Sequence, residues 1–299
     1  MTDQLVAPTL PDAERMHSLA DGVSIVMAAL NHVDYTQRCL DSIHSHTDLP
    51  YEIIVVDNGS TDGTSETART AGCRVIRNHE NLGCARAWNQ GIRAAVAPLI
   101  VVMNNDIVVT SGWVRKLNEF RLRHGVAVVS PVVINGECDY ELETFARDYV
   151  RKFGDRWRPG WAAMCFLTTA ETFARVGLFD ERFLGFGFED EDWEIRLGRA
   201  RIPTAITGSV IIHHFHQITT KNLAGDKWKR VKNPNKTVLE QIWGWRLIVR
   251  RVRKELQRFW NRLRFPGFHG RDPRDVLTVL DVERLDLERG IKVRRPAAG

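Results

Sequence analysis

Residues 51–71 read "YEIIVVDNGSTDGTSETARTA" and place a strand, a turn and a helix in direct succession. The run from Tyr51 to Asp57 is apolar and β-branched, a composition that suits a strand buried on both faces. Asn-Gly and Asp-Gly pairs follow, and both are ordinary turn pairs. Asp62 then stands where it can cap a helix over "GTSETARTA". This stretch therefore predicts one strand–helix unit of a parallel sheet.

The same alternation continues on both sides of this unit. Further strands are expected at 23–30, 73–76 and 98–103, and further helices at 34–46 and 84–95. Asp34 is the expected N-cap of the first of these helices, with Gln37 three residues later. Because strand and helix in turn imply right-handed βαβ units, we predict an α/β fold with a mostly parallel central sheet flanked by helices.

The second half of the chain has a less regular pattern. A strand is predicted at 161–169, a short helix at 170–177, a glycine-rich loop running into a helix at 179–200, and one or two strands at 204–216. We expect a disordered N-terminus at 1–20, one domain at 21–220 and a basic, partly helical extension at 221–299. The domain is expected to consist of two halves, 21–133 and 134–220.

Charge and cysteine content narrow the class of protein. The formal net charge is +5, but the segment from Lys221 to Arg264 holds 14 Lys and Arg against three acids, so the remainder is mildly acidic. Five scattered cysteines without a CxxC pair indicate reduced thiols in a cytosolic compartment. The first 22 residues lack an apolar signal region, and apolar runs of about ten residues are too short to span a bilayer. We expect a cytoplasmic protein, with peripheral contact at the inner face of the membrane as an option.

Polar residues follow each predicted strand at the edge where a parallel sheet binds its ligands, namely Asn31, 57–62, 78–86 and 104–106. Asp57 either belongs to an ordinary strand-to-helix loop or accepts hydrogen bonds from a nucleotide base or ribose. Asp106 is free of a capping role, because Thr110 and Ser111 stand nearer the next helix. A carboxylate in that position suits Mg²⁺ or Mn²⁺ beside a phosphorylated ligand.

Two later motifs have both a structural and a functional interpretation. "FEDEDWEIRL" (188–197) places four acids at a helix start, where they either complement the helix dipole or supply a general base. "IIHHFH" (211–216) either packs within a strand or supplies metal ligands, and strand geometry puts His213 opposite His214 and His216.

The basic extension contains an amphipathic helical pattern, with one apolar face formed by Trp245, Ile248, Val252 and Leu256. Three interpretations stay open for it. The helix packs on the domain, lies on an anionic membrane surface, or binds nucleic acid.

Taken in order, five blocks resemble the inverting, nucleotide-sugar-dependent glycosyltransferases of family 2, which have the GT-A (Rossmann-like) fold. The blocks are "VSIVMAALNHVDYTQRCLDSI", "EIIVVDNGSTDGT", "NHENLGCARAWNQGI", "LIVVMNNDIVV", and "GLFDERFLGFGFEDEDWEIRLGRA" with the histidines after it. The resemblance runs from about Val23 to about Thr220 and is closest to the bacterial rhamnosyl- and polysaccharide-type members.

The resemblance implies roles for individual residues. The nucleotide would bind at Ala29, Asn31, Asp57, Asn58, Ser60, Arg86, Asn104 and Asn105. A divalent cation, Mn²⁺ or Mg²⁺, would bind at Asp106, in the position of the family's DxD motif, and at His213. Asp190 would be the catalytic base, supported on the acceptor side by Glu189, Asp192 and Trp193.

These features predict a metal-dependent, inverting glycosyltransferase that moves a sugar from a UDP, dTDP or GDP donor to a hydroxyl group, in cell-envelope, O-antigen or capsular glycan synthesis. The acceptor is expected to be a glycan or a lipid-linked glycan, with peripheral contact to an anionic membrane and no contact with nucleic acid. Two alternatives remain: a glycosyltransferase acting on a protein or small molecule, and an inactive nucleotide- or polyanion-binding protein.

Overall fold

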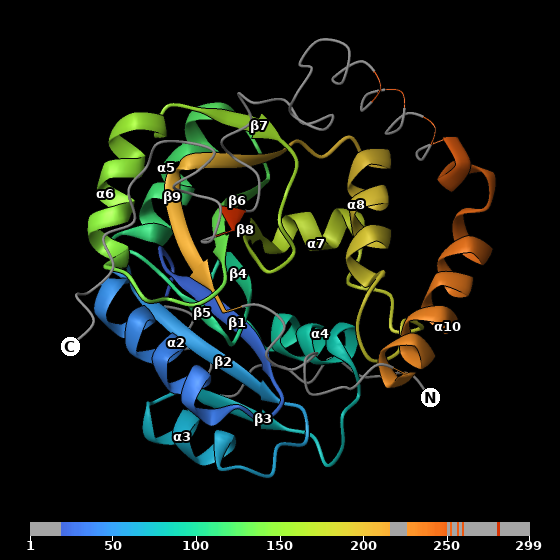
Figure 1. The fold of residues 1–299 in the computed structure, drawn as a ribbon, viewed down its shortest axis with the longest axis horizontal. Helices are drawn as coiled ribbons and strands as arrows, with labels where there is room; N and C mark the ends of the chain where they lie inside the picture. Colours follow the sequence, from blue (N-terminus) through green and yellow to red (C-terminus); the bar gives the residue numbers. More distant parts are fainter. Residues whose placement is uncertain are drawn as a thin grey trace.

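The computed structural model describes residues 19–215 and 226–249, together with positions 252, 256, 259, 280 and 281. Its strands are β1 Val23–Ala29, β2 Tyr51–Asp57, β3 Arg74–Arg77, β4 Leu99–Asn104, β5 Ile107–Val108, β6 Val128–Asn135, β7 Trp157–Pro159, β8 Cys165–Thr169, β9 Thr204–His214 and β10 Leu280–Asp281. Its helices are α2 Val33–His46, α3 Thr64–Thr70, α4 Cys84–Ala94, α5 Trp113–His124, α6 Leu142–Phe153, α7 Ala170–Val176, α8 Glu189–Arg199 and α10 Asp226–Trp243. The predicted α/β fold, with helices flanking a central sheet, is confirmed (Figure 1).

The sheet is parallel where the sequence alternates most regularly. Its strand order is β3-β2-β1-β4-β8-β6-β9-β5, and the pairs among β1 to β4 are all parallel. β8 then pairs antiparallel with β4 and β6, while β6 and β9 pair parallel. The expected boundary after residue 133 falls inside β6, so strands of both expected halves belong to one continuous sheet.

The register brings the predicted strand ends to one edge of the sheet. Ala29 at the end of β1 pairs with Asp57 at the end of β2, and Ala28 pairs with Asn104 at the end of β4. Asp57 also pairs with Arg77, the last residue of β3. Because these parallel strands end level with one another, the loops that follow them meet at the edge where such sheets bind ligands.

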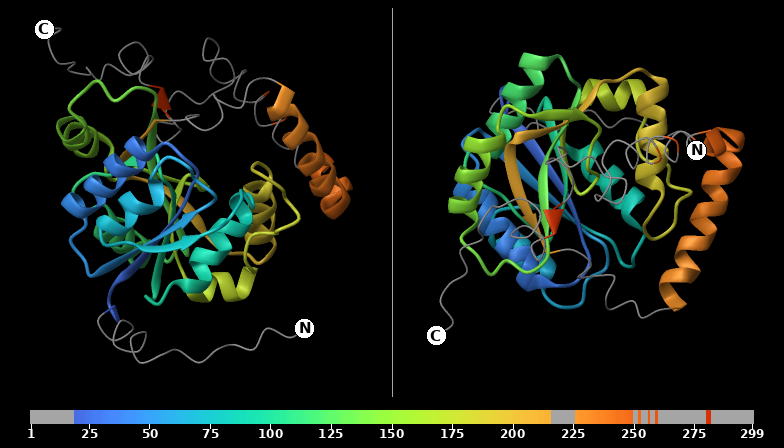
Figure 2. Two further views of the ribbon diagram at one scale, coloured as in Figure 1. Left: turned by 90° about the horizontal axis from the view of Figure 1, so that it is seen from below. Right: turned by 45° about the horizontal axis from the view of Figure 1, so that its top comes forward.

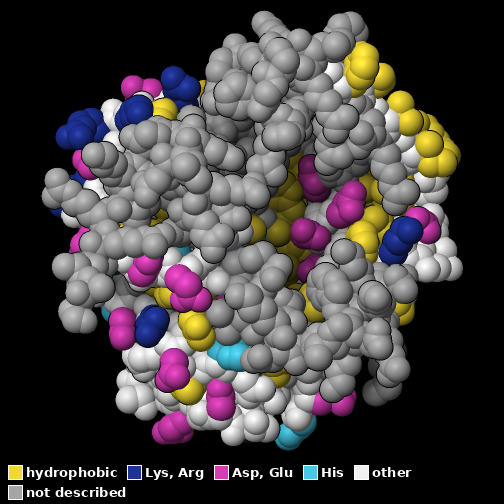
Figure 3. Space-filling view, in the orientation of Figure 1, with side chains coloured by type: hydrophobic (Ala, Val, Ile, Leu, Met, Phe, Trp, Pro, Cys, Tyr) yellow, Lys and Arg dark blue, Asp and Glu magenta, His cyan; other side chains and the backbone are white. Residues whose placement is uncertain are grey.

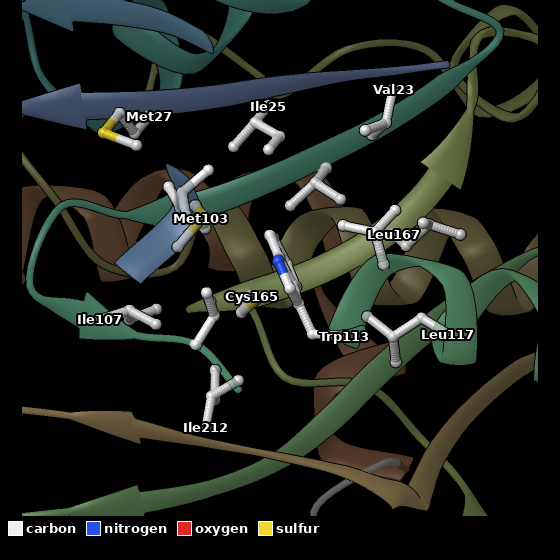
Figure 4. Packing of buried hydrophobic residues seen from close by; sticks show 14 of the residues in the cluster. Val23, Ile25, Met27, Met103, Ile107, Trp113, Leu117, Cys165, Leu167 and Ile212 are labelled. Atoms are coloured by element: carbon white, nitrogen blue, oxygen red, sulfur yellow. The ribbon is translucent and has the colours of Figure 1, made fainter. Parts of the chain in front are cut away.

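Helices cover both faces of the sheet and enclose two large apolar clusters. On one face α2 and α5 pack against the strands, and Figure 4 shows Trp113 of α5 pointing into the cluster with Met103 and Leu167 around it. On the other face α4 and α8 contribute Trp88 and Trp193 to the second cluster. Burial of apolar side chains is the main source of stability for a folded domain, so these two clusters hold the strand ends and their loops in fixed positions.

Local expectations fail at two places. The sequence does not predict β6, because Pro131 lies in its middle and proline argues against a central strand; a shift of register between Pro131 and Val132 accommodates it. The expected N-cap is also wrong, because Asp34 lies inside the first turn of α2. Asp62 from the loop after β2 caps the start of α2 instead, since its Oδ2 accepts a hydrogen bond from the Val33 N–H at 3.0 Å.

Helix α10 lies beside α8 and the loop before it, as two views show (Figures 1 and 2). Leu239 and Trp243 of α10, with Leu247 just beyond it, are buried against Phe183. This part of the basic extension therefore packs on the domain, whereas the predicted apolar face of Trp245, Ile248, Val252 and Leu256 is exposed, so the choice among its three interpretations stays open. Apart from residues 226–249, 252, 256, 259, 280 and 281, the extension at 221–299 lies outside the described residues, as do residues 1–18. Leu19, within the terminus expected to be disordered at 1–20, is buried. Each helix in the described part of the chain is too short or too polar to cross a bilayer.

Candidate active site

The loop after β2 is shaped by the carboxylate of Asp57. Asp57 is fully buried, and its oxygens accept hydrogen bonds from the Ser60 N–H at 2.8 Å and from the Ser65 hydroxyl. Both oxygens of Asp57 therefore accept hydrogen bonds from protein groups, and its contact with a base or ribose stays a prediction. The Asp57 side chain therefore holds the loop after β2 in its conformation.

Asn58 connects the loop after β2 to the loop after β3. Its amide group donates to Oδ1 of Asn81 at 2.8 Å and to the Gly83 carbonyl at 3.3 Å. Its own Oδ1 accepts the Leu82 N–H and the Asn78 amide, each at 3.0 Å. Only 4% of Asn58 is exposed, so it acts by holding the two loops together.

Asn31 is the exposed member of the predicted nucleotide-binding residues at β1 and β2. Its N–H donates to the Ser60 hydroxyl at 2.8 Å, and its Oδ1 accepts the Thr61 N–H at 2.9 Å. Ala29, Asp57, Asn58 and Ser60 are all less than 5% exposed, whereas Asn31 is half-buried. Of this set, Asn31 therefore has the most exposed surface.

Asp106 and His214 face each other just beyond the end of β4. Oδ1 of Asp106 lies 3.2 Å from Nε2 of His214, and the Asn104 amide nitrogen lies 3.2 Å from the same ring nitrogen. Nδ1 of His214 lies 3.0 Å from Oδ1 of Asn135. With this oxygen as acceptor, Nδ1 carries the proton and Nε2 presents its lone pair beside the Asp106 carboxylate. An imidazole held in this way by its other nitrogen is typical of metal-binding histidines.

His213 lies on the opposite side of β9 from this pair. Its Nδ1 lies 2.8 Å from the Tyr140 hydroxyl, and its Nε2 lies 2.9 Å from the Gly136 carbonyl oxygen. Burial lowers its pKa to about 4, so the ring is neutral. Both ring nitrogens of His213 therefore contact protein groups. The histidine that lies beside Asp106 is His214, and not the predicted His213. His216 lies outside the described residues.

A divalent cation fits these side chains as part of its coordination. Mg²⁺ and Mn²⁺ commonly take one or two protein carboxylates and complete their shell with phosphate oxygens and water. Asp106 supplies one carboxylate, with 13% of its side chain exposed, and His214 supplies one imidazole nitrogen. In the described part of the chain, no group of three or more His, Cys, Asp and Glu side chains is arranged to hold a metal. The remaining ligands would therefore come from a phosphorylated substrate.

Two other predicted nucleotide-binding residues contact protein groups. The Asn105 amide donates to the Thr36 hydroxyl at 2.8 Å. Nε of Arg86 lies 3.6 Å from Oε2 of Glu181, and 47% of the Arg86 side chain is exposed. Ion pairs that are this exposed contribute little, so the contact with Glu181 does not keep Arg86 from an anionic ligand.

Glu189 and Asp190 begin α8, and Glu189 is buried whereas Asp190 is half-buried. Burial, with the Asp190 charge, raises the pKa of Glu189 to about 8. Its Oε2 has no hydrogen-bond partner among the described residues. Burial also raises the pKa of Asp190, whose Oδ1 accepts the Glu191 N–H at 2.9 Å. Since two adjacent carboxyls resist double ionisation, the charge of each one raises the pKa of the other in addition to the effect of burial.

Asp192 and Trp193, predicted to support the acceptor side, are parts of the core instead. Asp192 is 1% exposed; its Oδ2 accepts from Nε of Arg196 and its Oδ1 from the Trp243 indole, at 2.8 and 2.9 Å. Trp193 is fully buried among aromatic rings and donates its indole N–H to the Gly177 carbonyl at 2.9 Å. A side chain without exposed surface cannot line an acceptor pocket.

The loop before α8 lies against the N-terminus of α4. The Cys84 N–H donates to the Gly185 carbonyl at 2.6 Å, and a Cβ on Gly83 would come within 2.7 Å of the Gly185 nitrogen. Burial and then the charges of Glu189 and Asp190 raise the pKa of Cys84. Figure 3 shows acidic side chains gathered in a hollow beside α8. The structure therefore brings the loop before α8 into contact with the start of α4.

This architecture places the chain in the class of GT-A-fold glycosyltransferases, and solved structures share its fold. GalNAc-T7, solved with UDP, GalNAc and Mn²⁺, aligns with a TM-score of 0.54 at 15% identity, over 65% of this chain and 44% of the other. A mannosyltransferase from Pyrobaculum calidifontis, solved with GDP-Man and Mn²⁺, aligns with a TM-score of 0.51 at 20% identity, over 64% and 56%. Residues 24–183, more than half of the chain, match Glycosyl transferase family 2. The chain belongs to that family.

Characterised relatives cover different shares of the chain. An N-acetylglucosaminyl-diphospho-decaprenol L-rhamnosyltransferase from Mycobacterium tuberculosis is 25% identical over 69% of this chain and 80% of its own length. Glycosyltransferase AglE from Haloferax volcanii is 32% identical over 38% of each chain. A validoxylamine A glucosyltransferase from Streptomyces hygroscopicus is 26% identical over 62% of this chain and 49% of its own. The chain thus spans half or less of the length of the last two.

Proposed function

We propose that this chain is a metal-dependent, inverting glycosyltransferase that moves a sugar from a nucleoside-diphosphate donor to a hydroxyl acceptor. The observation that carries the proposal is the pair formed by Asp106 and His214 at the carboxyl edge of the sheet, in a chain of family 2. Two proteins of the same fold were solved with UDP or GDP-Man and with Mn²⁺, which are ligands of the kind proposed here.

The proposed cation site uses two side chains: Asp106 lies between β4 and β5, and His214 is the last residue of β9. Asp106 would bind the cation through its carboxylate and His214 through Nε2, while Asn135 keeps the imidazole in the required tautomer. When bound, the cation stabilises the negative charge of the diphosphate leaving group. Arg86, whose side chain is 47% exposed in the first turn of α4, is the cationic side chain that we propose for the same phosphates.

The proposed chemical step is one displacement with Asp190 as base. The carboxylate of Asp190 takes the proton of the acceptor hydroxyl while that oxygen bonds to the anomeric carbon. The bond from this carbon to the diphosphate oxygen breaks on the opposite face, so the configuration inverts and no covalent intermediate forms. The raised pKa of Asp190 suits a base that works near neutral pH. Glu189, which stays protonated there, adds no second charge to repel the diphosphate.

We propose a lipid-linked glycan as acceptor, in envelope or capsular glycan synthesis. The mycobacterial relative carries diphospho-decaprenol in the name of its acceptor. Beyond α10, six apolar residues at helical spacing are 52% to 67% exposed: Trp245, Ile248, Val249, Val252, Leu256 and Phe259. Figure 3 shows hydrophobic side chains along this edge of the molecule. Because the surrounding segment is strongly basic, an anionic lipid surface is the partner that fits the stripe.

The first experiment is a thermal-shift screen of UDP-, dTDP- and GDP-sugars with and without Mn²⁺. The proposal expects one group of donors to raise Tm in the presence of Mn²⁺ and to be turned over slowly to the nucleoside diphosphate. If none of the three groups shifts Tm or is turned over, the alternative of an inactive nucleotide- or polyanion-binding protein replaces this proposal.

A second experiment tests the membrane surface. Co-sedimentation with anionic vesicles is expected for the intact chain, and reduced co-sedimentation for the variant W245E/I248E, whose substitutions lie on exposed positions. Equal binding by both proteins would contradict the membrane assignment. Transfer to soluble acceptors at full rate without vesicles would favour the alternative of a protein or small-molecule acceptor.

A further inference from the structure

The loop of residues 184–187, which leads into α8, is bound on one side by a single side chain of α10. Asn235 is fully buried, although it belongs to the extension beyond the family-matched residues 24–183. Its Oδ1 accepts the Leu184 N–H at 2.9 Å, and its amide donates to the carbonyls of Leu184 at 2.7 Å and Gly187 at 2.9 Å. The Phe186 carbonyl lies 3.4 Å from the same amide nitrogen. One side chain therefore satisfies most of the inward-facing backbone of this loop.

The loop needs such support because its backbone is unusual. Gly185, Gly187 and Phe188 have φ angles of 67°, 96° and 75°, in the left-handed region. Phe188 is the strained member, since a side chain with Cβ adopts this conformation at a cost. Strained backbone persists only where its surroundings hold it. Asn235 supplies hydrogen bonds on the side of α10, and the Cys84 N–H binds Gly185 on the side of α4.

A second contact ties the same helix to α8. The Trp243 indole donates to Oδ1 of Asp192 at 2.9 Å, two residues after Asp190. Leu239 and Trp243 also pack in one cluster with Phe183 and Phe188, which flank the loop. Helix α10 therefore holds both the loop and the first turn of α8, the two elements that set the direction of the Asp190 side chain.

We propose that Asn235 is a positioning residue for the transfer reaction: from α10 it fixes loop 184–187 and so holds the Asp190 carboxylate in the direction of the acceptor. This inference rests on the proposed role of Asp190 as base. Asn235 touches no reacting atom and acts through the loop backbone. Since the loops after β2 and β3 are also held by Asn58 and Asp57, we expect the loss of Asn235 to change donor binding less than the chemical step.

Kinetics separate this role from a general loss of stability. Asn235→Ala is expected to lower kcat at least tenfold and to leave the donor KM within about twofold, because misplacing a catalytic group affects the chemical step first. Asn235→Asp keeps the acceptor for the Leu184 N–H but places a carboxylate oxygen against the carbonyls of Leu184 and Gly187, so its kcat is expected to fall at least as far as that of Asn235→Ala. Gln241→Ala, an exposed amide on the same helix, is the matched control and is expected to behave as wild type.

Hydrogen exchange of the 183–190 backbone gives a readout that does not depend on activity. Faster exchange in Asn235→Ala and Asn235→Asp, with the β1–β4 region unchanged, is the expected result. Wild-type kcat in both Asn235 variants, or unchanged exchange at 183–190, would overturn the proposal. A fall in kcat accompanied by an equal rise in donor KM would also overturn it. If the wild-type protein turns over no donor, the proposed function fails, and the exchange measurement still decides whether Asn235 holds the loop.

Discussion

Replacement of His214 by alanine is expected to remove most of the Mn²⁺-dependent binding of the donor, whereas replacement of His213 by phenylalanine is expected to leave it intact. The two residues are neighbours in β9, and their side chains lie on opposite sides of the strand. Nε2 of His214 lies 3.2 Å from the Asp106 carboxylate, and both nitrogens of His213 are bonded elsewhere. The two variants therefore separate metal binding from structure within one dipeptide.

The magnitudes follow from the contacts that each change removes. Loss of a residue that only orients a metal-binding imidazole costs about 10- to 100-fold in metal affinity, so Asn135→Ala is expected to have an effect of that size. His214→Ala removes the ligand itself and is expected to exceed it. His213→Phe leaves the Tyr140 hydroxyl and the Gly136 carbonyl without partners, at about 1 to 3 kcal/mol of stability for each buried group.

The assay is a titration of Mn²⁺ in the presence of a bound nucleoside diphosphate, followed by calorimetry, with urea unfolding of each variant in parallel. His214→Ala should bind the nucleotide more weakly with Mn²⁺ and equally without it. His213→Phe should unfold at lower urea but titrate like the wild type. The opposite pattern, with Mn²⁺ dependence lost in His213→Phe and kept in His214→Ala, would refute the assignment of the two histidines.

Three further outcomes follow from the same contacts. Asp190→Asn is expected to lower kcat by about 10²- to 10⁴-fold while calorimetry shows unchanged Mn²⁺-dependent donor binding; an unchanged kcat would exclude it as base. Burial raises the pKa of Glu189 from 4.5 to about 8, so its contribution to stability is complete below pH 4.5 and is lost as pH rises through about 8. The difference between the Tm of Glu189→Gln and that of the wild type should therefore grow as the pH rises from 4.5 to about 8. A difference that stays constant over this range would show that Glu189 ionises normally. Gly83→Ala would bring a Cβ within 2.7 Å of the Gly185 nitrogen, at a backbone φ of 88°. Gly63 has a similar φ of 91°, but a Cβ there would meet no atom within 4 Å, so Gly83→Ala should lower the stability to urea more than Gly63→Ala. Equal losses of stability would mean that the contact between Gly83 and Gly185 is not tight.

The fold of the first half could be predicted because local and global signals agree there. Each strand from β1 to β4 has a short core of β-branched apolar residues, each is followed by a helical pattern, and the structure reproduces all four within two residues. The level ends of these strands follow from the parallel register, so the edge that carries Asn31 and Asp106 could be expected as well. The second half mixes parallel and antiparallel pairs, and no local pattern specifies which strand lies beside β4.

Site residues were harder to predict because their roles depend on burial and on partners from distant segments. Asp57 sits at the predicted strand end, yet its contacts with Ser60 and Ser65 turn it inward. The period of two in β9 separates His213 from His214, but only the pairing of His214 with Ile107 of β5 shows which one reaches Asp106.

The residues predicted for the acceptor side, which lie in α8, were hard to assign for the same reason. The helical period places Trp193 on a buried side, and the structure agrees with that pattern rather than with the acceptor role implied by the resemblance. Asn235 had no sequence signal, because it lies 51 residues after Leu184, the residue that it binds.

The central claim is that Asp190 drives a single displacement at the anomeric carbon with the help of a cation at Asp106 and His214. It is tested most directly by proton NMR of the sugar released when the protein hydrolyses its preferred donor with Mn²⁺, recorded before the anomers equilibrate. The account predicts that the first sugar to appear has the anomeric configuration opposite to that of the donor, and that Asp190→Asn releases almost none. Release of the same anomer as in the donor, or equal release by Asp190→Asn, would contradict it.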